Sequence, residues 1–190
     1  MRPPGGINLA RGKAVHKATE ADNRCFIDNR TRLDVEVLTL IAEEKFDEIL
    51  LKEGLFIPKS KEGDRDKIIS KARSEVVTSV KLYAEMEKDW EPVSTEENYT
   101  IDIGYPLPTN CYLDMVDTTN CIWDWKTQAK KGTIQAGIQD MFYSKAYEAK
   151  WGVRPSFKYC CLILTQKPYV DIQVIDPIQD YSILDRYVKA

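Results

Sequence analysis

The sequence is organised around residues 111–127, which read CYLDMVDTTNCIWDWKT. Two segments rich in apolar and aromatic residues, Cys111–Val116 and Cys121–Thr127, flank the polar cluster Asp117–Asn120. Apolar and aromatic segments favour strands, whereas a short polar cluster favours a turn. The stretch therefore predicts a β-hairpin.

This hairpin brings charged residues to one face. Side chains alternate across a strand, so Asp124 and Lys126 share a face of the second strand. If the turn centres on Thr119, Asp114 lies directly opposite Asp124, because each is five residues from the centre. Directly opposed residues have Cβ atoms about 4.5–5.5 Å apart, and two carboxylates that close repel each other unless a cation lies between them. The hairpin is thus a candidate cation site with an ammonium group beside it.

Such a combination suits the hydrolysis of a phosphodiester. A divalent ion lowers the pKa of a water molecule and offsets negative charge in the transition state, and Lys126 can orient that water or stabilise the charge. The alternative is that Asp124 and Lys126 form only a weak ion pair on a solvated strand face, which is common. Trp123 and Trp125 occupy the opposite face, and we expect them to pack in the core rather than to stack on bases.

The rest of the sequence predicts a mixed α/β domain. Helices are expected over residues 8–24, 33–52, 66–90 and 133–151, with a short one at the C-terminus. Further strands are expected over residues 98–103, 157–165 and 170–175. The order of these elements indicates one central sheet in a single domain of residues 1–190, with an N-terminal helical part (8–90) and a catalytic sheet core (96–176).

Length and charge set limits on the function. A chain of 190 residues suffices for one sizeable core. The net charge of −3 gives no global positive field, so binding to DNA would need a local basic groove. No apolar stretch approaches the roughly 20 residues needed to cross a bilayer, and the N-terminus lacks the apolar core of a signal peptide. We therefore expect an intracellular, cytoplasmic protein without membrane contact (in the host cytoplasm if the chain is viral).

Four pieces of the sequence resemble the RecB-like branch of the PD-(D/E)XK nuclease superfamily, and they follow one another in the family's order. They are Gly12-x-x-x-His16-x-x-x-Glu20, Asp114 within the run YLDMVD, Asp124-Trp125-Lys126-Thr127 as the D-x-K-T strand, and Gln139-x-x-x-Tyr143 as the Q-x-x-x-Y helix. Each piece alone is weak, since a lone histidine is more often packed or solvated and a Gln–Tyr pair one turn apart is often only a surface pair. Together they favour a nuclease.

The resemblance implies a fold and a metal centre. It implies a restriction-endonuclease-like core, in which a central mixed sheet is flanked by helices. His16, Asp114 and Asp124 would bind Mg²⁺ or Mn²⁺, with the backbone carbonyl of Trp125 as a further ligand. Glu20, one turn beyond His16, could orient the histidine ring.

It also implies roles around the metal. Lys126 would be the catalytic lysine, and Gln139 and Tyr143 would steady it or contact the DNA backbone. The family often has a glutamate upstream of its first aspartate, where this chain has Glu97. It usually has a glycine where this chain has Tyr112, which could narrow the approach of the substrate.

Contacts with DNA are expected from local positive charge. Lys130 and Lys131 lie close to the Asp-x-Lys strand in the sequence, and Arg11 lies on the helix of His16. With Tyr143 they are the residues we expect to meet the DNA, and binding should weaken with salt. The alternative is that these are ordinary solvated side chains. That is at least as good an account of Lys13 and Lys17 on the same helix.

The cysteines do not indicate a second kind of site. Relatives in this branch sometimes hold an iron–sulfur cluster through four cysteines, but the five cysteines of this chain lack that spacing and form no C-x-x-C pair: Cys25, Cys111, Cys121, Cys160 and Cys161. We expect reduced thiols and no iron–sulfur cluster.

The resemblance therefore predicts a divalent-metal-dependent DNA nuclease. An exonuclease in recombination, repair or viral DNA processing is preferred, with a helicase or recombination protein as a partner. A structure-selective or single-strand endonuclease is the second reading, because the same catalytic face would serve it. The third is an inactive nuclease fold that only binds DNA or a partner. The presence of Asp114, Asp124 and Lys126 argues against this third reading.

Overall fold

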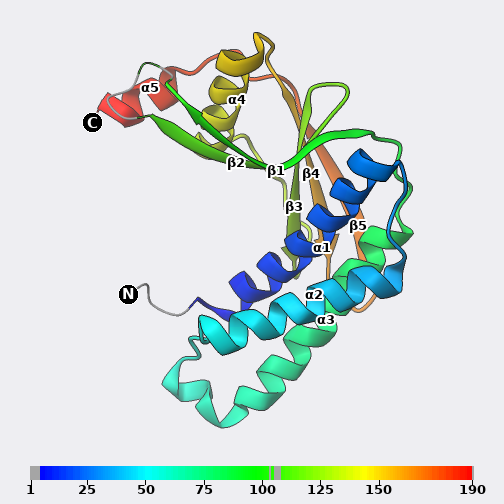
Figure 1. The fold of residues 1–190 in the computed structure, drawn as a ribbon. Coiled ribbons are helices and arrows are strands. Elements are labelled where there is room, and N and C mark those ends of the chain that lie inside the picture. Colours follow the sequence, from blue (N-terminus) through cyan, green and yellow to red (C-terminus); the bar gives the residue numbers. More distant parts are fainter. Residues whose placement is uncertain (1–4, 103, 105–107, 190) are drawn as a thin grey trace.

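The computed structural model describes residues 5–102, 104 and 108–189. Within them a five-stranded sheet carries helices on both faces (Figure 1). The elements in chain order are α1 (Ile7–Asn29), α2 (Val35–Lys52), η1 (Lys59–Asp64), α3 (Arg65–Glu85), β1 (Pro92–Ile101), β2 (Thr109–Asp117), β3 (Cys121–Gln128), α4 (Ile138–Trp151), β4 (Ser156–Ile163), β5 (Tyr169–Ile175) and α5 (Ser182–Lys189). None of the described helices is both long and apolar enough to cross a membrane.

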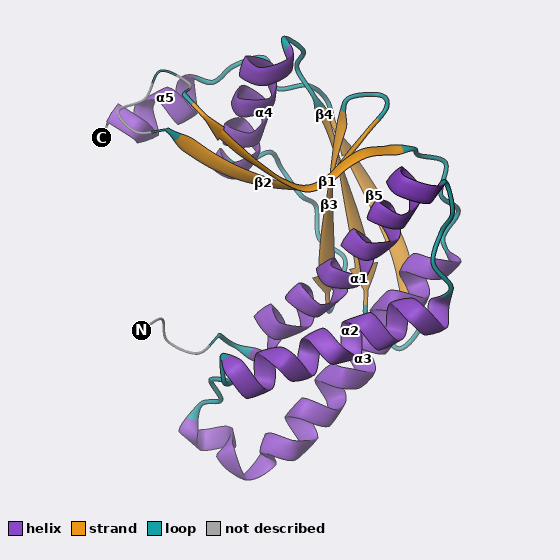
Figure 2. Ribbon diagram, in the orientation of Figure 1, coloured by secondary structure: helices purple, strands orange, loops and turns teal. Residues whose placement is uncertain are grey.

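The strands lie side by side in sequence order, β1-β2-β3-β4-β5. Neighbours are antiparallel except β3 and β4, which run parallel. Parallel neighbours need a long crossover connection, and α4 lies in the one that joins this pair. The sheet is therefore mixed, as expected from the sequence (Figure 2).

Two buried clusters hold the helices to the sheet. One joins α1–α3 to the face that carries Trp123 and Trp125, and the other joins α4 and α5 to the opposite face. The ring of Trp123 lies 4.4 Å from that of Trp90, and the ring of Trp125 meets Tyr83 edge-on at 5.1 Å between centroids. Both tryptophans of β3 therefore pack in the core, and this part of the prediction is confirmed.

Several boundaries differ from those expected. Strand β1 begins at Pro92, six residues before the expected strand. Helix α4 begins at Ile138 and not at Thr133. The N–H of Ile134 instead donates to the side chain of Gln173 on β5, and that of Gly137 donates to Asp140 at the start of the helix. The segment before α4 is thus tied to the sheet, which keeps it out of the helix.

Strands β1 and β2 bend together, near Glu96 on β1 and between Leu113 and Met115 on β2. On β2, Cys111 and Leu113 pack toward α4, whereas Met115, two residues on, packs toward α1–α3. On the facing strand, Glu96 has a φ of 48°, a left-handed conformation that few non-glycine residues adopt. At this bend β1 and β2 turn away from the other strands, and Figure 1 shows an open, C-shaped molecule.

The two arms of this shape can be defined by their elements. The upper arm in Figure 1 contains the far ends of β1 and β2 with α4 and α5, and the lower arm contains α1–α3. Helix α1 lies along the inner side of the lower arm, where it passes the bend in β1 and β2. Residues of the helix and of the bend can therefore meet.

Candidate functional site

The turn between β2 and β3 is fixed by the buried carboxylate of Asp117. Its Oδ1 accepts hydrogen bonds from the backbone N–H of Thr119 (2.8 Å) and of Cys121 (3.1 Å), and its Oδ2 accepts one from the indole of Trp123 (2.8 Å). These bonds set the register of the two strands, in which Met115 pairs with Trp123. This register centres on Thr119, as the sequence predicted.

The same register directs Asp114 toward β3. The pair after Met115 and Trp123 would be Asp114 and Asp124, and Oδ2 of Asp114 accepts a hydrogen bond of 3.0 Å from the N–H of Trp125. The two carboxylates lie close enough that each shifts the pKa of the other. Both therefore contribute to one site.

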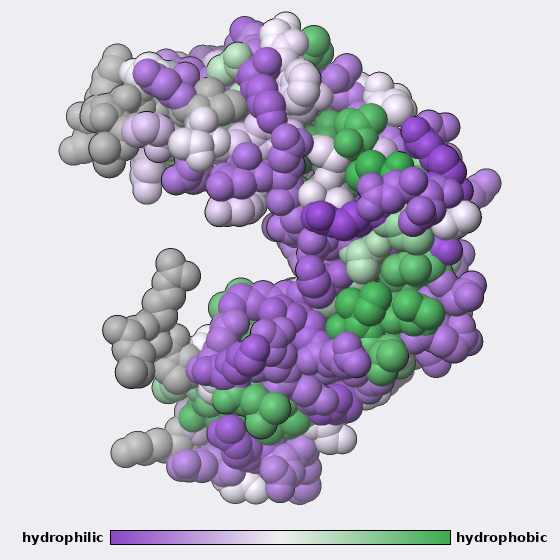
Figure 3. Space-filling model, viewed as in Figure 1, coloured by the Kyte–Doolittle hydropathy of each residue, from purple (hydrophilic) through white to green (hydrophobic). Residues whose placement is uncertain are grey.

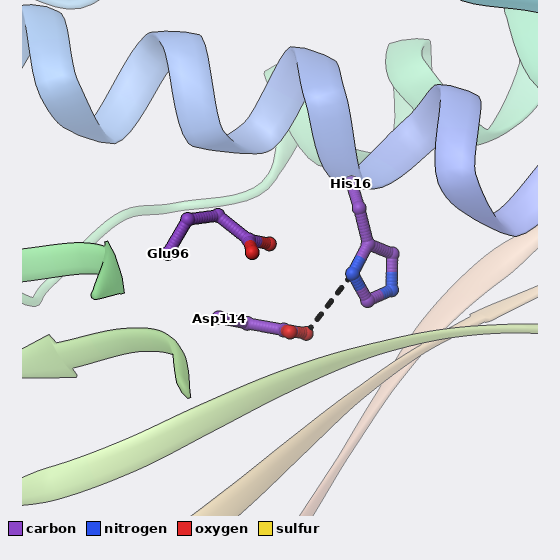
Figure 4. Close-up of side chains that lie close together, drawn as sticks. All are labelled: His16, Glu96 and Asp114. Carbon is purple, nitrogen blue, oxygen red and sulfur yellow. Dashed lines mark ion pairs between the residues drawn. The ribbon is translucent and has the colours of Figure 1, made fainter. Parts of the chain in front are cut away.

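His16 reaches this site from α1 (Figure 4). Its Nδ1 lies 3.2 Å from Oδ2 of Asp114, and its Nε2 lies 2.6 Å from the carbonyl oxygen of Trp125. Burial lowers the pKa of His16, but the hydrogen bond and charge of Asp114, with the carbonyl of Trp125, outweigh burial and raise the pKa to about 9. An acceptor faces each ring nitrogen, and only the protonated ring can donate to both.

Glu96 is the residue of the site that the sequence did not single out. Its neighbours Thr95 and Glu97 pair with Met115 and Leu113, so Glu96 faces Asp114 across the strands. Figure 4 shows its carboxylate directed toward His16 and Asp114. Burial, followed by the charge of Asp114, raises the pKa of Glu96 to about 7.

The adjacent glutamate has a different environment. Glu97, which stands where the resemblance suggested a glutamate, forms an ion pair of 2.8 Å with Lys150 on α4. Neighbouring side chains of a strand point to opposite faces, so Glu96 lies with Asp114 while Glu97, paired with Leu113, lies outside the site. Two adjacent glutamates cannot be distinguished by the sequence pattern alone.

These side chains fit a divalent cation. His16, Glu96 and Asp114 each offer one ligand atom, and the three atoms lie within 4.8 Å of one another. Burial and the charge of Asp114 also raise the pKa of Asp124 to about 7. A cation would offset this crowding of negative charge, and carboxylate oxygens with one imidazole suit Mg²⁺, Mn²⁺ or a similar ion.

Lys126 lies beside the carboxylates. Its Nζ is 2.5 Å from Oδ2 of Asp124 and 5.8 Å from the ring centroid of Tyr159. The ammonium group is therefore held on the same face as Asp124, as alternation along β3 predicted. If these residues held a cation, a phosphate bound between that cation and Lys126 would meet positive charge on both sides.

The Gln–Tyr pair of α4 lies near this face. The side-chain amide of Gln139 donates a hydrogen bond of 2.7 Å to the hydroxyl of Tyr143. Burial raises the pKa of Tyr143, and the charges of Asp114 and Asp124 raise it further. The hydroxyl is thus protonated at neutral pH and, while it accepts from Gln139, can donate to a third group.

A cleft of about 550 Å³ opens over part of this site, where His16, Glu96 and Asp114 line it. One wall is a single face of α1 that includes Leu9, Gly12 and His16, and Tyr112 and Tyr143 line it from β2 and α4. Figure 3 shows the hollow between the two arms, with largely hydrophilic residues around it. The candidate metal ligands therefore open onto a space that a substrate can enter.

A family model of the PD-(D/E)XK nuclease superfamily matches residues 2–189. The chain belongs to this superfamily. Its mixed sheet between two groups of helices is a restriction-endonuclease-like fold, and the superfamily consists of metal-dependent nucleases. No curated protein and no solved structure matches the chain.

Glu20 was expected to orient the ring of His16 in this nuclease. Glu20 lines the cleft, but it forms ion pairs with Lys17 (2.7 Å) and Arg24 (3.1 Å). The nitrogens of His16 face Asp114 and the Trp125 carbonyl, so Glu20 does not orient the histidine ring in this structure.

The basic residues expected to meet DNA are dispersed around the nuclease fold. Arg11 is buried and paired with Glu75 of α3 on another side of α1 from the cleft, so its position does not support contact with DNA. Lys130 lies with Arg11 on that side, and Lys131 forms an ion pair of 2.7 Å with Asp171 of β5. The sequence could not show this, because a helix face and a pairing partner are set by tertiary packing.

Proposed function

We propose that this PD-(D/E)XK nuclease acts on DNA and is of the RecB-like type, working as an exonuclease in recombination, repair or viral DNA processing. The observation that carries the proposal is the convergence of α1, β2 and β3 on one site. His16 lies 3.2 Å from Asp114, Asp114 and Asp124 shift each other's pKa, and Lys126 pairs with Asp124. The order of these residues and the Gln139–Tyr143 pair support the RecB-like branch. The preference for an exonuclease rests on that resemblance.

In the proposed mechanism, His16, Asp114, Asp124 and the backbone carbonyl of Trp125 would hold Mg²⁺ or Mn²⁺. Glu96, which lies with His16 and Asp114, would join them. When bound, such an ion activates water for attack on phosphorus and offsets the negative charge of the phosphate. Binding requires a neutral imidazole, so His16 must first lose the proton that Asp114 and the Trp125 carbonyl stabilise. The site therefore exchanges a proton for the cation.

Lys126 has the second role in this mechanism. Lys126 pairs with Asp124, and this ion pair would weaken once the carboxylate of Asp124 served as a metal ligand. The ammonium group would then be able to donate to a phosphate oxygen. There it stabilises the charge that develops in the transition state, or orients the attacking water. Tyr143, held by Gln139, can donate a hydrogen bond to the phosphate from the opposite wall of the cleft.

The test is cleavage of end-labelled DNA with Mg²⁺ or Mn²⁺. Asp124→Ala and Lys126→Ala are each expected to lower the rate by about 100-fold or more, the range for loss of a group that stabilises transition-state charge. Lys167→Ala is the control, because Lys167 is exposed in the turn between β4 and β5, away from the cleft. Equal rates for Lys126→Ala and the control would remove Lys126 from the mechanism.

The form of the DNA separates the alternatives. Only an endonuclease can open a circular strand, so cleavage of linear but not circular substrates supports an exonuclease. Cleavage of both supports the single-strand or structure-selective endonuclease. Binding without cleavage of linear, circular or branched DNA, with either ion, would leave the inactive fold that binds DNA or a helicase.

A further inference from the structure

Tyr112 is an exposed aromatic residue at the edge of the proposed active site. It lies on β2, two residues before Asp114, and lines the cleft with 55% of its surface exposed. An exposed ring forgoes the free energy of burial. This ring is instead available to a ligand beside a candidate metal ligand.

We infer that Tyr112 stacks on an unpaired base, and that the substrate of this nuclease is a single strand or the frayed end of a duplex. The inference rests on the proposed function and adds to it the class of substrate. Stacking on Tyr112 would hold the base in the cleft and leave its phosphate to reach Asp114, with the Asp124–Lys126 pair beyond it.

The shape of the cleft suits a single strand. A volume of about 550 Å³ lies within the range of roughly 300–1,000 Å³ that is typical of sites for small ligands. That is room for a nucleotide. Gly12 lies on the α1 wall of the same cleft, and a Cβ atom added to it would meet nothing within 4 Å. The space in front of Gly12 is therefore open to a ligand.

The charges of the cleft also favour a single strand over a duplex. Its three lysines are each paired with a carboxylate: Lys13 with Glu53 (2.6 Å), Lys17 with Glu20 (2.7 Å) and Lys45 with Glu48 (2.9 Å). Duplex DNA presents about one phosphate charge per 1.7 Å of helix axis, and proteins bind it chiefly by neutralising that charge. Paired lysines contribute little to this, so a neutral contact such as stacking must supply part of the affinity.

Stacking also discriminates between the two forms of DNA. Base–aromatic stacking tolerates any sequence because every base has a π face, but a base inside a duplex has both faces covered by its neighbours. Tyr112 can therefore stack on a base of a single strand or of a frayed end, but not on a base inside a duplex. The ring selects for single strands without reading their sequence.

The test measures binding in EDTA, so that no cleavage occurs. Single-stranded oligonucleotides that carry 2-aminopurine report stacking by loss of fluorescence, and a duplex of the same sequence is measured in parallel. Tyr112→Ala is expected to weaken single-strand binding by about 5- to 140-fold, which corresponds to ~1–3 kcal/mol of stacking. It should also abolish the quenching and change duplex binding less than twofold.

Two variants control for other effects of the substitution. Tyr112→Phe keeps the ring and should retain the affinity and the quenching. Tyr187→Ala removes a ring of similar exposure on α5, away from the cleft, and should behave as the unaltered protein does. If Tyr112→Ala binds and quenches as Tyr187→Ala does, or weakens duplex and single strand equally, the inference is wrong.

Cleavage assays with Mg²⁺ or Mn²⁺ separate this inference from the proposed function. A protein that cleaves DNA, but whose KM for single strands is unchanged by Tyr112→Ala, keeps the function and loses the inference. A protein that cleaves nothing, yet stacks bases through Tyr112, keeps single-strand recognition and loses the nuclease. For the inference to hold, Tyr112→Ala must raise KM for single strands more than it lowers kcat.

Discussion

At the scale of single residues, the site depends on which carboxylates face the cation. Glu96 and Glu97 are adjacent, but only Glu96 lies with His16 and Asp114, whereas Glu97 pairs with Lys150. A left-handed conformation at a non-glycine residue costs roughly 1–3 kcal/mol, and such outliers cluster at functional sites. The strained backbone at Glu96 is therefore consistent with a role in binding the cation.

The first prediction concerns this pair of glutamates. Glu96→Gln removes a charged ligand atom and should weaken the binding of Mn²⁺ by at least about 10-fold, because loss of a group that only supports a ligand already costs about 10- to 100-fold. Glu97→Gln is the matched control and should change the affinity less than twofold, since its ion pair lies outside the site. Isothermal titration calorimetry compares the three proteins, and equal affinities would exclude Glu96 as a ligand.

The second prediction concerns pH in the metal-free protein. Folding raises the pKa of His16 to about 9 and those of Glu96 and Asp124 to about 7. Each group holds its proton more tightly when folded. Its contribution to stability is therefore complete below its ordinary pKa, near 6.5 for His16 and 4 for the acids, and is lost as the pH rises through the folded value.

Stability in EDTA should accordingly fall between pH 5 and pH 9. Urea denaturation at pH 6, 7.5 and 9 measures this trend. In His16→Gln, the part of the decrease between pH 7.5 and 9 should be smaller, because the residue that titrates there is gone. A free energy of unfolding that rises over this interval would contradict the assignment of the His16 proton.

At the scale of elements, the hairpin is the part that the sequence predicted best. Its two strands, its turn and its register all follow from local alternation and from polar turn residues, and each is confirmed. Local patterns work here because the partners are close in sequence. The carboxylate that fixes the turn, Asp117, was predicted only as part of a polar cluster.

The third prediction tests that carboxylate. Asp117→Ala leaves the indole N–H of Trp123 and two backbone N–H groups of the turn without their acceptor. Since each buried unsatisfied donor costs about 1–3 kcal/mol, the free energy of unfolding should fall by about 3 kcal/mol. Thr118→Ala, in the same turn but exposed, should stay within about 0.5 kcal/mol of the unaltered protein. Urea denaturation distinguishes the two.

Contacts between distant elements were harder to predict. The start of β1 at Pro92 and that of α4 at Ile138 both depend on partners far away in the chain. Asp140, for example, accepts hydrogen bonds from Gly137 and from Tyr159 of β4, and the second partner cannot be read from helical periodicity. For the same reason Glu96 was missed: its place opposite Asp114 follows only once β1 is known to extend past it.

At the scale of the whole molecule, the candidate metal ligands join the two arms. His16 comes from α1 of the lower arm, whereas Glu96 and Asp114 come from the bend that leads to the upper arm. Elsewhere α1 is held by a buried network in which Asp22 accepts hydrogen bonds from Tyr83 (2.6 Å) and Arg32 (3.0 Å). The cation would thus add a direct link between α1 and the bend, beside the buried cluster that packs α1 on the sheet.

The fourth prediction follows from this link. A cation that binds only the folded state at 100 times its Kd adds about 2.7 kcal/mol, which raises the melting temperature of a domain of this size by about 5–10 °C. Differential scanning calorimetry with Mn²⁺ and with EDTA measures the shift. His16→Ala should abolish it and Glu97→Gln should preserve it. A full shift in His16→Ala would show that the ion binds elsewhere.

The order of the site residues along the chain also determines when activity can appear during synthesis. His16 belongs to the first helix, Asp114 and Lys126 to the middle strands, and α4 and β4, which complete the sheet around them, come later still. A ribosome-bound fragment that ends before β3 lacks both Asp124 and Lys126. Under the proposed function, a growing chain cannot cut the nucleic acid around it before β3 and the later elements α4 and β4 have been made.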